Sequence, residues 1–163
     1  MINSKEALFR LALGEQVRNN VGPYIPDNVE RNQSFPDGRL GNTARMPDGT
    51  FKIGIAKIQS VDDFFKYIKG EKGLTSQQKK LVFDELIKEY PEEYLRKLIR
   101  TEADAETILA YHELDHVDHY ENDNIIYAKN KDLFDPEKIA IEVRATKVAI
   151  EKLIAYKIQK AKE

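Results

Sequence analysis

The chain contains no cysteine among its 163 residues. Disulfide bonds and thiolate-bound zinc are therefore both excluded, so any metal ion must be held by imidazole nitrogens and carboxylate oxygens. Histidine is also scarce, because the whole chain has three. All three lie in one short stretch, AYHELDHVDHY, at positions 110–120. This clustering makes the stretch the first candidate for a functional site.

Two further features are missing, a large excess of one charge and a long apolar run. The formal net charge of −2 argues against general nucleic-acid binding, which usually needs a basic surface. No apolar run approaches the ~20 residues that span a bilayer, so we expect no membrane insertion. The N-terminus lacks the small-residue cleavage site of a secretory signal. We therefore expect a cytoplasmic protein, or one associated with the virion if a phage encodes it.

The first quarter of the chain differs in composition from the rest. Residues 4–18 carry a rough apolar stripe that predicts a helix. Residues 19–42 hold three prolines and three glycines, which predicts a long loop or arm. We therefore expect an N-terminal helix with an extended arm over residues 1–42, and one folded domain over residues 43–163.

The expected folded domain begins with a small β element and continues as helices. The turn Pro47-Asp48-Gly49 separates residues 43–46 from residues 50–56, which predicts a β-hairpin. Helix starts are predicted near Ser60, Thr75 or Ser76, Pro91, residue 102 and Asp135. The expected fold class is α+β and mostly α, with a helical core and one small hairpin.

The histidine stretch contains His112, Glu113 and His116 in the pattern H-E-x-x-H. Positions four apart lie one above the other on a helix, so both imidazoles can bind one metal ion. The glutamate can hold a zinc-bound water and take its proton. Surface histidines, or histidines filling a polar gap, are the alternative. The helical phase favours zinc, because the histidines continue the apolar stripe and buried imidazoles need partners.

A third zinc ligand must come from elsewhere in the chain. His119 is the nearest candidate, but it stands roughly 10 Å from His112 along a helix. The helix expected from Asp135 to about residue 160 offers Glu142 on the edge of its apolar stripe, among small residues that permit close helix packing. A carboxylate buried there needs a metal or a cation. We predict Glu142 as the third ligand, with a salt bridge to Arg144 or a lysine as the alternative.

With these motifs the chain resembles zincin metallopeptidases of the gluzincin type, in which a glutamate from a later helix completes an H-E-x-x-H site. It is most similar to the ImmA/IrrE-type metallopeptidases, whose second motif is a glutamate followed by small residues. HELDH and EVRATKVA correspond to the two motifs, and the likeness covers about residues 43–155. It implies a zinc ion on His112, His116 and Glu142, Glu113 as general base, and a protein or peptide substrate.

The resemblance also implies a place for the substrate. Zincins align an extended peptide along an edge strand by β-augmentation, and residues 51–56 would form that strand. Phe51 and Ile53 would then contact the peptide. His119 would lie at the rim of the site, where it would touch substrate, stabilise the oxyanion or be purely structural.

Several neighbours of the motif are candidates for supporting roles. Three tyrosines could donate a hydrogen bond to an oxyanion: Tyr111, Tyr120 and Tyr127. Asp115 and Asp118 could orient a ligating imidazole, with solvent exposure as the alternative for each.

Two functions of different classes follow. The first is a zinc-dependent metallopeptidase. The second is a structural or assembly protein on the same scaffold, such as a viral or phage virion component. The long arm over residues 19–42 supports the second, because loops of that length are usually functional or disordered, and this one could bind assembly partners.

Overall fold

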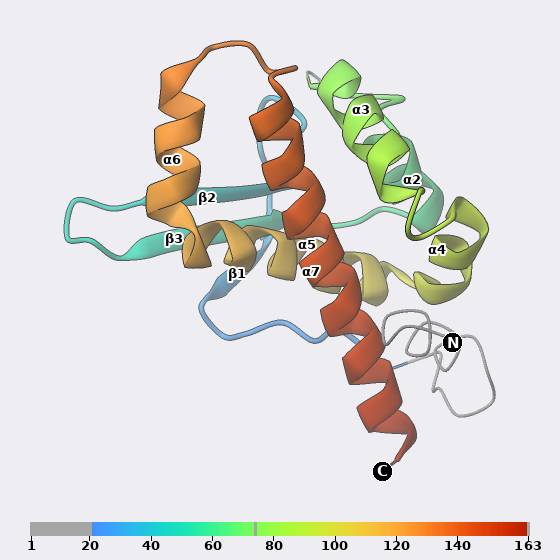
Figure 1. Cartoon of the computed structure of the whole chain (residues 1–163). Helices are drawn as coiled ribbons and strands as arrows, with labels where there is room; N and C mark the ends of the chain where they lie inside the picture. The colour runs from blue at the N-terminus through green and yellow to red at the C-terminus, as the bar shows by residue number, and fades with distance from the viewer. Residues whose placement is uncertain (1–20, 74, 163) are drawn as a thin grey trace.

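The computed structural model describes residues 21–73 and 75–162, so the helix expected over residues 4–18 lies outside the described residues. Within them the chain is mostly helical with one small sheet, which confirms the expected α+β class (Figure 1). The elements are β1 (Val29–Gln33), β2 (Gly41–Arg45), β3 (Phe51–Ala56), α2 (Val61–Ile68), α3 (Ser76–Leu86), α4 (Glu92–Leu98), α5 (Glu102–Asp118), α6 (Tyr120–Lys129) and α7 (Pro136–Ala161). No helix in this described part is long and apolar enough to cross a membrane.

The expected hairpin is confirmed. Strands β2 and β3 pair in antiparallel register from Gly41 opposite Ile55 to Arg45 opposite Phe51. The turn between them is tight, because the Gly49 amide donates to the Met46 carbonyl at 2.9 Å and Gly49 has a φ of +88°. That backbone conformation favours glycine.

Strand β3 is the central strand of the sheet, so the expectation that residues 51–56 form an edge strand is wrong. The strand order is β1-β3-β2, with β1 parallel to β3. Both backbone edges of β3 are hydrogen-bonded, which leaves no edge for a peptide to join. The edge strand on the hairpin side is β2.

The expectation of an irregular arm over residues 19–42 is wrong for the residues that form β1 and the start of β2. The expected boundary between residues 42 and 43 falls inside β2. Strand β1 could not be predicted because Val29 is its only buried side chain, so its sequence lacks the alternation of apolar and polar residues that is typical of a strand. The Tyr24 amide donates to Thr107 Oγ1 at 2.9 Å, and Arg31 pairs with Glu106 at 2.6 Å. Both contacts fasten this segment to α5.

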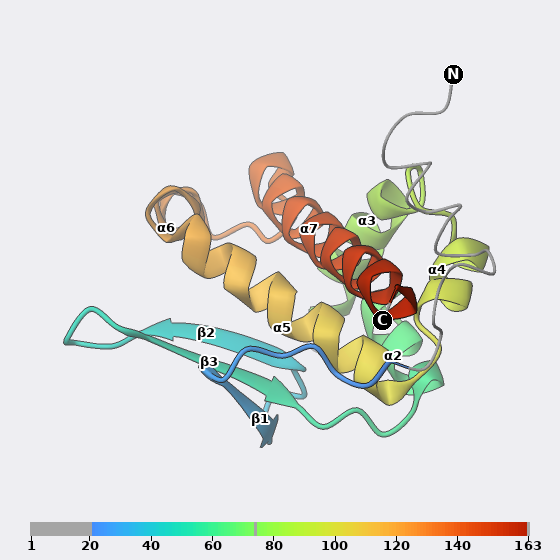
Figure 2. The same ribbon diagram turned by 90° about the horizontal axis from the view of Figure 1, so that it is seen from below.

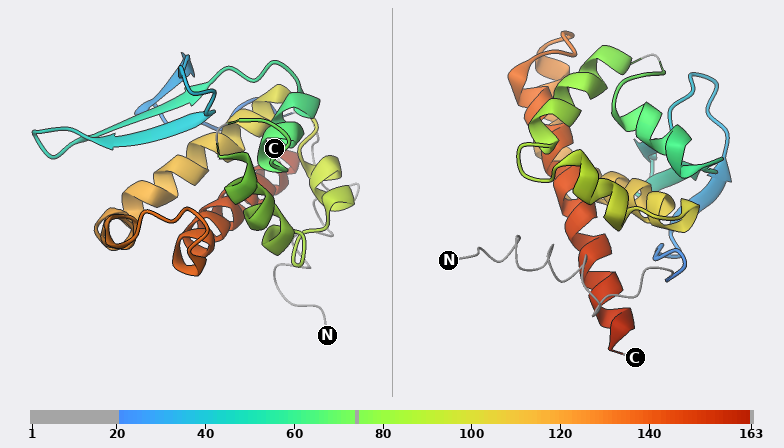
Figure 3. Two further views of the ribbon diagram at one scale, coloured as in Figure 1. Left: turned by 90° about the horizontal axis from the view of Figure 1, so that it is seen from above. Right: turned by 90° about the vertical axis from the view of Figure 1, so that its right-hand side faces the viewer.

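Helix α5 lies between two layers. Figure 2 shows the sheet along one face of α5 and α7 crossing the other, and the left panel of Figure 3 shows the same arrangement from the opposite side. Being covered on both faces explains why Ala105, Ile108 and Ala110 are buried. It also places the H-E-x-x-H turn of α5 against both the hairpin and α7.

The remaining helices close the ends of this three-layer core. Figure 2 shows α2, α3 and α4 together at one end of the core, where α3 packs against α7. The expected cap of α2 is confirmed, because Ser60 Oγ accepts from the Asp63 amide at 3.0 Å. Helix α6, which was not expected, follows α5 after a sharp turn at His119 and packs beside the N-terminal half of α7 (Figure 1).

Candidate metal centre

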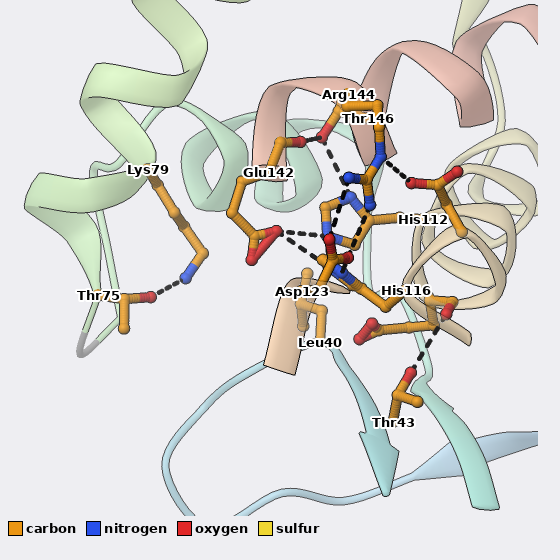
Figure 4. Close-up of polar contacts among 12 residues, drawn as sticks. Leu40, Thr43, Thr75, Lys79, His112, His116, Asp123, Glu142, Arg144 and Thr146 are labelled. Atoms are coloured by element: carbon orange, nitrogen blue, oxygen red, sulfur yellow. Dashed lines mark hydrogen bonds and ion pairs between the residues drawn. The ribbon is translucent and has the colours of Figure 1, made fainter. Parts of the chain in front are cut away.

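His112 and His116 lie one turn apart near the C-terminal end of α5, and both side chains point toward α7 (Figure 4). Their Nε2 atoms are 3.2 Å apart. Glu142 approaches from α7, with Oε2 at 3.1 Å from His112 Nε2 and 3.0 Å from His116 Nε2. Three potential ligand atoms from two helices therefore converge on one point.

The spacing of these atoms is compatible with one tetrahedral zinc ion. Bonds of about 2.0–2.1 Å in tetrahedral geometry hold ligand atoms about 3.3 Å apart. The observed separations of 3.0, 3.1 and 3.2 Å are close to that value. Two imidazoles and one carboxylate are also the donor set of a site that leaves a fourth position open.

In the absence of a metal ion, the Glu142 carboxylate and the two imidazoles influence the pKa values of one another. Burial opposes a charge on His116, but the hydrogen bond and the negative charge of Glu142 outweigh it and raise the pKa of His116 to about 9. Burial likewise opposes ionisation of Glu142, but hydrogen bonds with His112 and His116 hold its pKa well below the usual range. At neutral pH a protonated His116 therefore faces an ionised Glu142.

Glu113 lies beside the pair and has an unusual environment. Its side chain is buried, and among the described residues its Oε2 has no hydrogen-bond partner. Burial raises the pKa of the Glu113 carboxyl group, although the nearby histidines partly oppose the effect. An unpartnered buried carboxylate next to a candidate metal centre suits a group that accepts a proton.

Each converging side chain is supported by a further residue. Thr146 Oγ1 lies 3.1 Å from His112 Nδ1 and donates to the Glu142 carbonyl, so the imidazole can donate to it and keep Nε2 for a metal. The Tyr127 hydroxyl donates to Glu142 Oε1 at 3.0 Å, which leaves Oε2 turned toward the histidines. Asp123 lies 3.4 Å from His116 Nδ1.

Arg144 does not pair with Glu142, which was the alternative role for that glutamate. It contacts Asp115 at 2.8 Å and Asp123 at 2.7 Å instead (Figure 4). Asp115 is buried and held by this arginine, whereas Asp118 is exposed. The carboxylate beside a candidate ligand is therefore Asp123 on α6, and neither Asp115 nor Asp118 orients His112 or His116.

A cavity of about 510 Å³ opens at the three converging side chains. Its walls come from β2, α2, α3, α5, α6 and α7. The polar and small residues of its lining include Arg39, Gly41, Tyr67, Gln78, Lys79, His112, Glu113, His116, Tyr127 and Glu142. The volume is typical of a small-molecule or side-chain binding pocket.

Most of the other predicted site residues lie outside this arrangement. His119 ends α5, places Nδ1 3.0 Å from the Asp115 carbonyl and does not line the cavity. Ile53 is almost completely buried in the sheet, and Phe51 packs against Tyr120 with ring centroids 5.0 Å apart. Tyr111 packs on Tyr24 away from the cavity, whereas Tyr120 and Tyr127 line it.

The residues of the site that were not identified from the sequence include Tyr67, Gln78, Lys79, Asp123 and Thr146. Thr146 had a usable signal, because it lies one helical turn after Glu142 on the same face. Asp123 likewise lies one helical turn before Tyr127 on α6, but α6 was not expected from the sequence. Tyr67 and Lys79 reach the cavity only through the packing of α2 and α3, and no local pattern marks them.

Comparison of the chain with protein-family models, curated proteins and solved structures finds no match. The residues of the site and the motifs of α5 and α7 are therefore the basis for inferring the function of the chain.

Proposed function

We propose that the chain is a zinc-dependent metallopeptidase, with zinc bound by His112, His116 and Glu142. The observation that carries the proposal is the convergence of three ligand atoms from α5 and α7, separated by 3.0–3.2 Å. Glu113 of the same H-E-x-x-H motif lies beside them. The resemblance to the ImmA/IrrE-type metallopeptidases implies the same four residues.

The proposed chemistry divides between the ion and the protein. Zinc in a three-ligand site acidifies a water molecule and polarises a peptide carbonyl. Glu113 takes the proton of the attacking water and passes it to the departing amine, and burial makes its carboxylate a stronger base for this step. Tyr127 and Thr146 hold Glu142 and His112 in the orientation that binding requires.

We place the peptide substrate along β2 instead of β3. Strand β2 is the sheet edge that reaches the cavity, through Gly41, Asn42 and Thr43. An extended peptide can add to such an edge through main-chain hydrogen bonds. Thr43 Oγ1 also donates to the Glu113 carbonyl at 3.3 Å, so the edge is tied to the helix that carries the proposed base.

Peptide hydrolysis by matched variants tests the proposal. Purified wild-type protein with zinc should cleave a mixture of fluorogenic peptides or an unfolded protein. Glu113→Gln should retain zinc and fold but lose cleavage, because an amide cannot accept the proton. Glu102→Gln, on the exposed first turn of the same helix, should cleave like wild type.

The alternative is a structural or assembly protein, including a virion component, on the same scaffold. A wild-type protein that binds zinc, cleaves nothing and forms a stable complex would support it. The described part of the arm does not favour this role, because Arg31 binds Glu106 and the Val21 carbonyl accepts from Tyr156 within the same chain. For a peptidase we propose a cytoplasmic location, or the virion if a phage encodes it.

A further inference from the structure

Among the described residues that line the cavity, one cation lacks an ion pair. Arg39 contacts Asp37 at 2.6 Å, and Asp123 contacts Arg144 at 2.7 Å. Lys79 also lines the cavity, but its amino group forms no ion pair with any carboxylate of the described residues. Lysine is rarely buried unless its charge is paired, so a half-buried lysine without a carboxylate suggests a negatively charged ligand.

The position of Lys79 directs it at the candidate metal centre. The side chain extends from α3, and its amino group donates to Thr75 Oγ1 and lies 4.1 Å from the centroid of the Tyr67 ring. Figure 4 shows the amino group on the side of Glu142 opposite the two histidines. Burial lowers the pKa of Lys79, and the charge of Glu142 partly opposes that effect.

Gln78 provides a second donor on the same wall. Its side chain is 8% exposed and lines the cavity. Among the described residues its amide nitrogen makes no hydrogen bond of ordinary geometry, but it interacts with the Tyr127 hydroxyl closely enough to oppose the rise in the pKa of that tyrosine. Buried donors are nearly always satisfied in folded proteins, so an acceptor that enters the cavity would complete the hydrogen bonding of this amide.

The charge balance of the filled site strengthens this point. Zinc bound to Glu142 would neutralise the carboxylate that now attracts Lys79. Glu113 and Glu142 together balance the two positive charges of the ion, so neither carboxylate would be left to pair with Lys79. An acceptor that meets Gln78 and Lys79 together is then best supplied by an anion.

We propose that Gln78 and Lys79 form a carboxylate-binding subsite, which selects peptides that carry a carboxylate close to the bond to be cut. The selection of a cleaved peptide rests on the proposed peptidase function, whereas carboxylate binding does not. The carboxylate belongs to an aspartate or glutamate side chain or to the C-terminus of the peptide. An ammonium group and an amide N–H suit both sources, because carboxylate oxygens accept several hydrogen bonds.

Binding of small peptides to the full chain tests the subsite without relying on hydrolysis. NMR titrations of zinc-loaded protein would compare N-acetylated, C-amidated Ala-Glu-Ala with Ala-Gln-Ala, and N-acetylated Ala-Ala-Ala with a free or an amidated C-terminus. We expect at least one carboxylate peptide to bind about tenfold more tightly than its neutral counterpart. The pair that shows the difference identifies the source of the carboxylate.

Variants of α3 connect that preference to the subsite. Lys79→Met should remove the preference, Lys79→Arg should retain most of it, and Lys80→Met should leave it unchanged because Lys80 is exposed and outside the cavity. Equal binding within both peptide pairs, no measurable binding to wild type, or a preference that survives Lys79→Met would each overturn the subsite.

Zinc content and hydrolysis, measured on the same samples, separate this proposal from the proposed function. A carboxylate preference without zinc or cleavage would retain the subsite and reject the peptidase. A zinc-loaded protein that cleaves peptides but shows no carboxylate preference would retain the peptidase and reject the subsite.

Discussion

His116 stands between two carboxylates, with Asp123 at 3.4 Å from Nδ1 and Glu142 at 3.0 Å from Nε2. The nitrogen that faces Glu142 is the one that would bind the metal. Because the pKa of His116 is raised to about 9, this nitrogen carries a proton at neutral pH in the zinc-free protein. In the proposed zinc site, a zinc ion and a proton would therefore compete for one atom.

Zinc affinity should consequently depend on pH. Below the His116 pKa of about 9 each bound zinc displaces one proton, so the apparent affinity should rise about tenfold per pH unit from pH 7 to 8.5. Calorimetric titrations in buffers of different ionisation enthalpy would count the released protons. The exposed His119 provides the control, since His119→Ala should show the same dependence. An affinity that stays constant over this range would contradict the competition.

At the residue scale, local motifs identified part of the site and tertiary packing supplied the rest. His112, His116 and Glu113 belong to one recognisable turn, and Glu142 lies on a helix face whose period can be read from the sequence. Asp123 reaches His116 only because the chain turns sharply between α5 and α6. No sequence period marks that turn, so this partner of His116 could not be predicted.

At the scale of the elements, β2 lies closely against α5 at Gly41. A Cβ atom built on Gly41 would lie 3.1 Å from Glu113 Cγ and 3.2 Å from its Cδ. Glycine therefore allows the edge strand to lie directly against the proposed base. The contact also limits the positions that the Glu113 side chain can take.

Gly41→Ala should therefore displace Glu113 by a few tenths of an ångström and slow peptide hydrolysis by about tenfold or more, because catalysis is sensitive to such shifts. Zinc content should not change. Gly54→Ala is the matched control, because its added Cβ would meet the flexible Gln33 side chain at 3.2 Å instead of the base. The measurement is the rate of peptide hydrolysis by each variant at full zinc occupancy. Equal rates would show that the β2 contact does not position Glu113.

Helices were predicted more successfully than strands, for a physical reason. Caps and apolar periods are local, and they located α2, α5 and α7 to within a few residues. Strand β1 has one buried side chain, and its pairing partner β3 lies beyond a hairpin strand in the sequence. Whether β3 is central or at the edge depends on that pairing, so it could not be read from β3 alone.

At the scale of the whole molecule, the site depends on how α5 and α7 cross. Away from the candidate metal centre, the fully buried Lys157 of α7 donates to Asp104 Oδ2 at 2.9 Å and to the Leu98 carbonyl. Asp104 also accepts from the backbone amides of Arg100 and Thr101 at the start of α5. One buried ion pair thus joins the C-terminal half of α7 to the beginning of the helix that carries the histidines.

Removal of that lysine should destabilise the entire fold. Lys157→Met leaves a buried Asp104 without its cation, which typically costs about 3–5 kcal/mol of unfolding free energy. Lys152→Met, on an exposed position of the same helix, should change it by less than about 0.5 kcal/mol. Urea unfolding monitored by circular dichroism compares them. Similar midpoints for the two variants would mean that the pair does not hold α5 and α7 together.

We propose that α5 and α7 share one zinc ion, so zinc binding should depend on Glu142 of α7, and Glu142→Ala measures that dependence. Wild-type protein should bind one zinc per chain, and Glu142→Ala should bind it at least about tenfold more weakly. His119→Ala should keep wild-type affinity, because His119 lies away from the converging atoms. The measurement is a competitive zinc titration with stoichiometry from elemental analysis. Wild-type affinity in Glu142→Ala, together with lost binding in His119→Ala, would mean that α7 does not hold the ion.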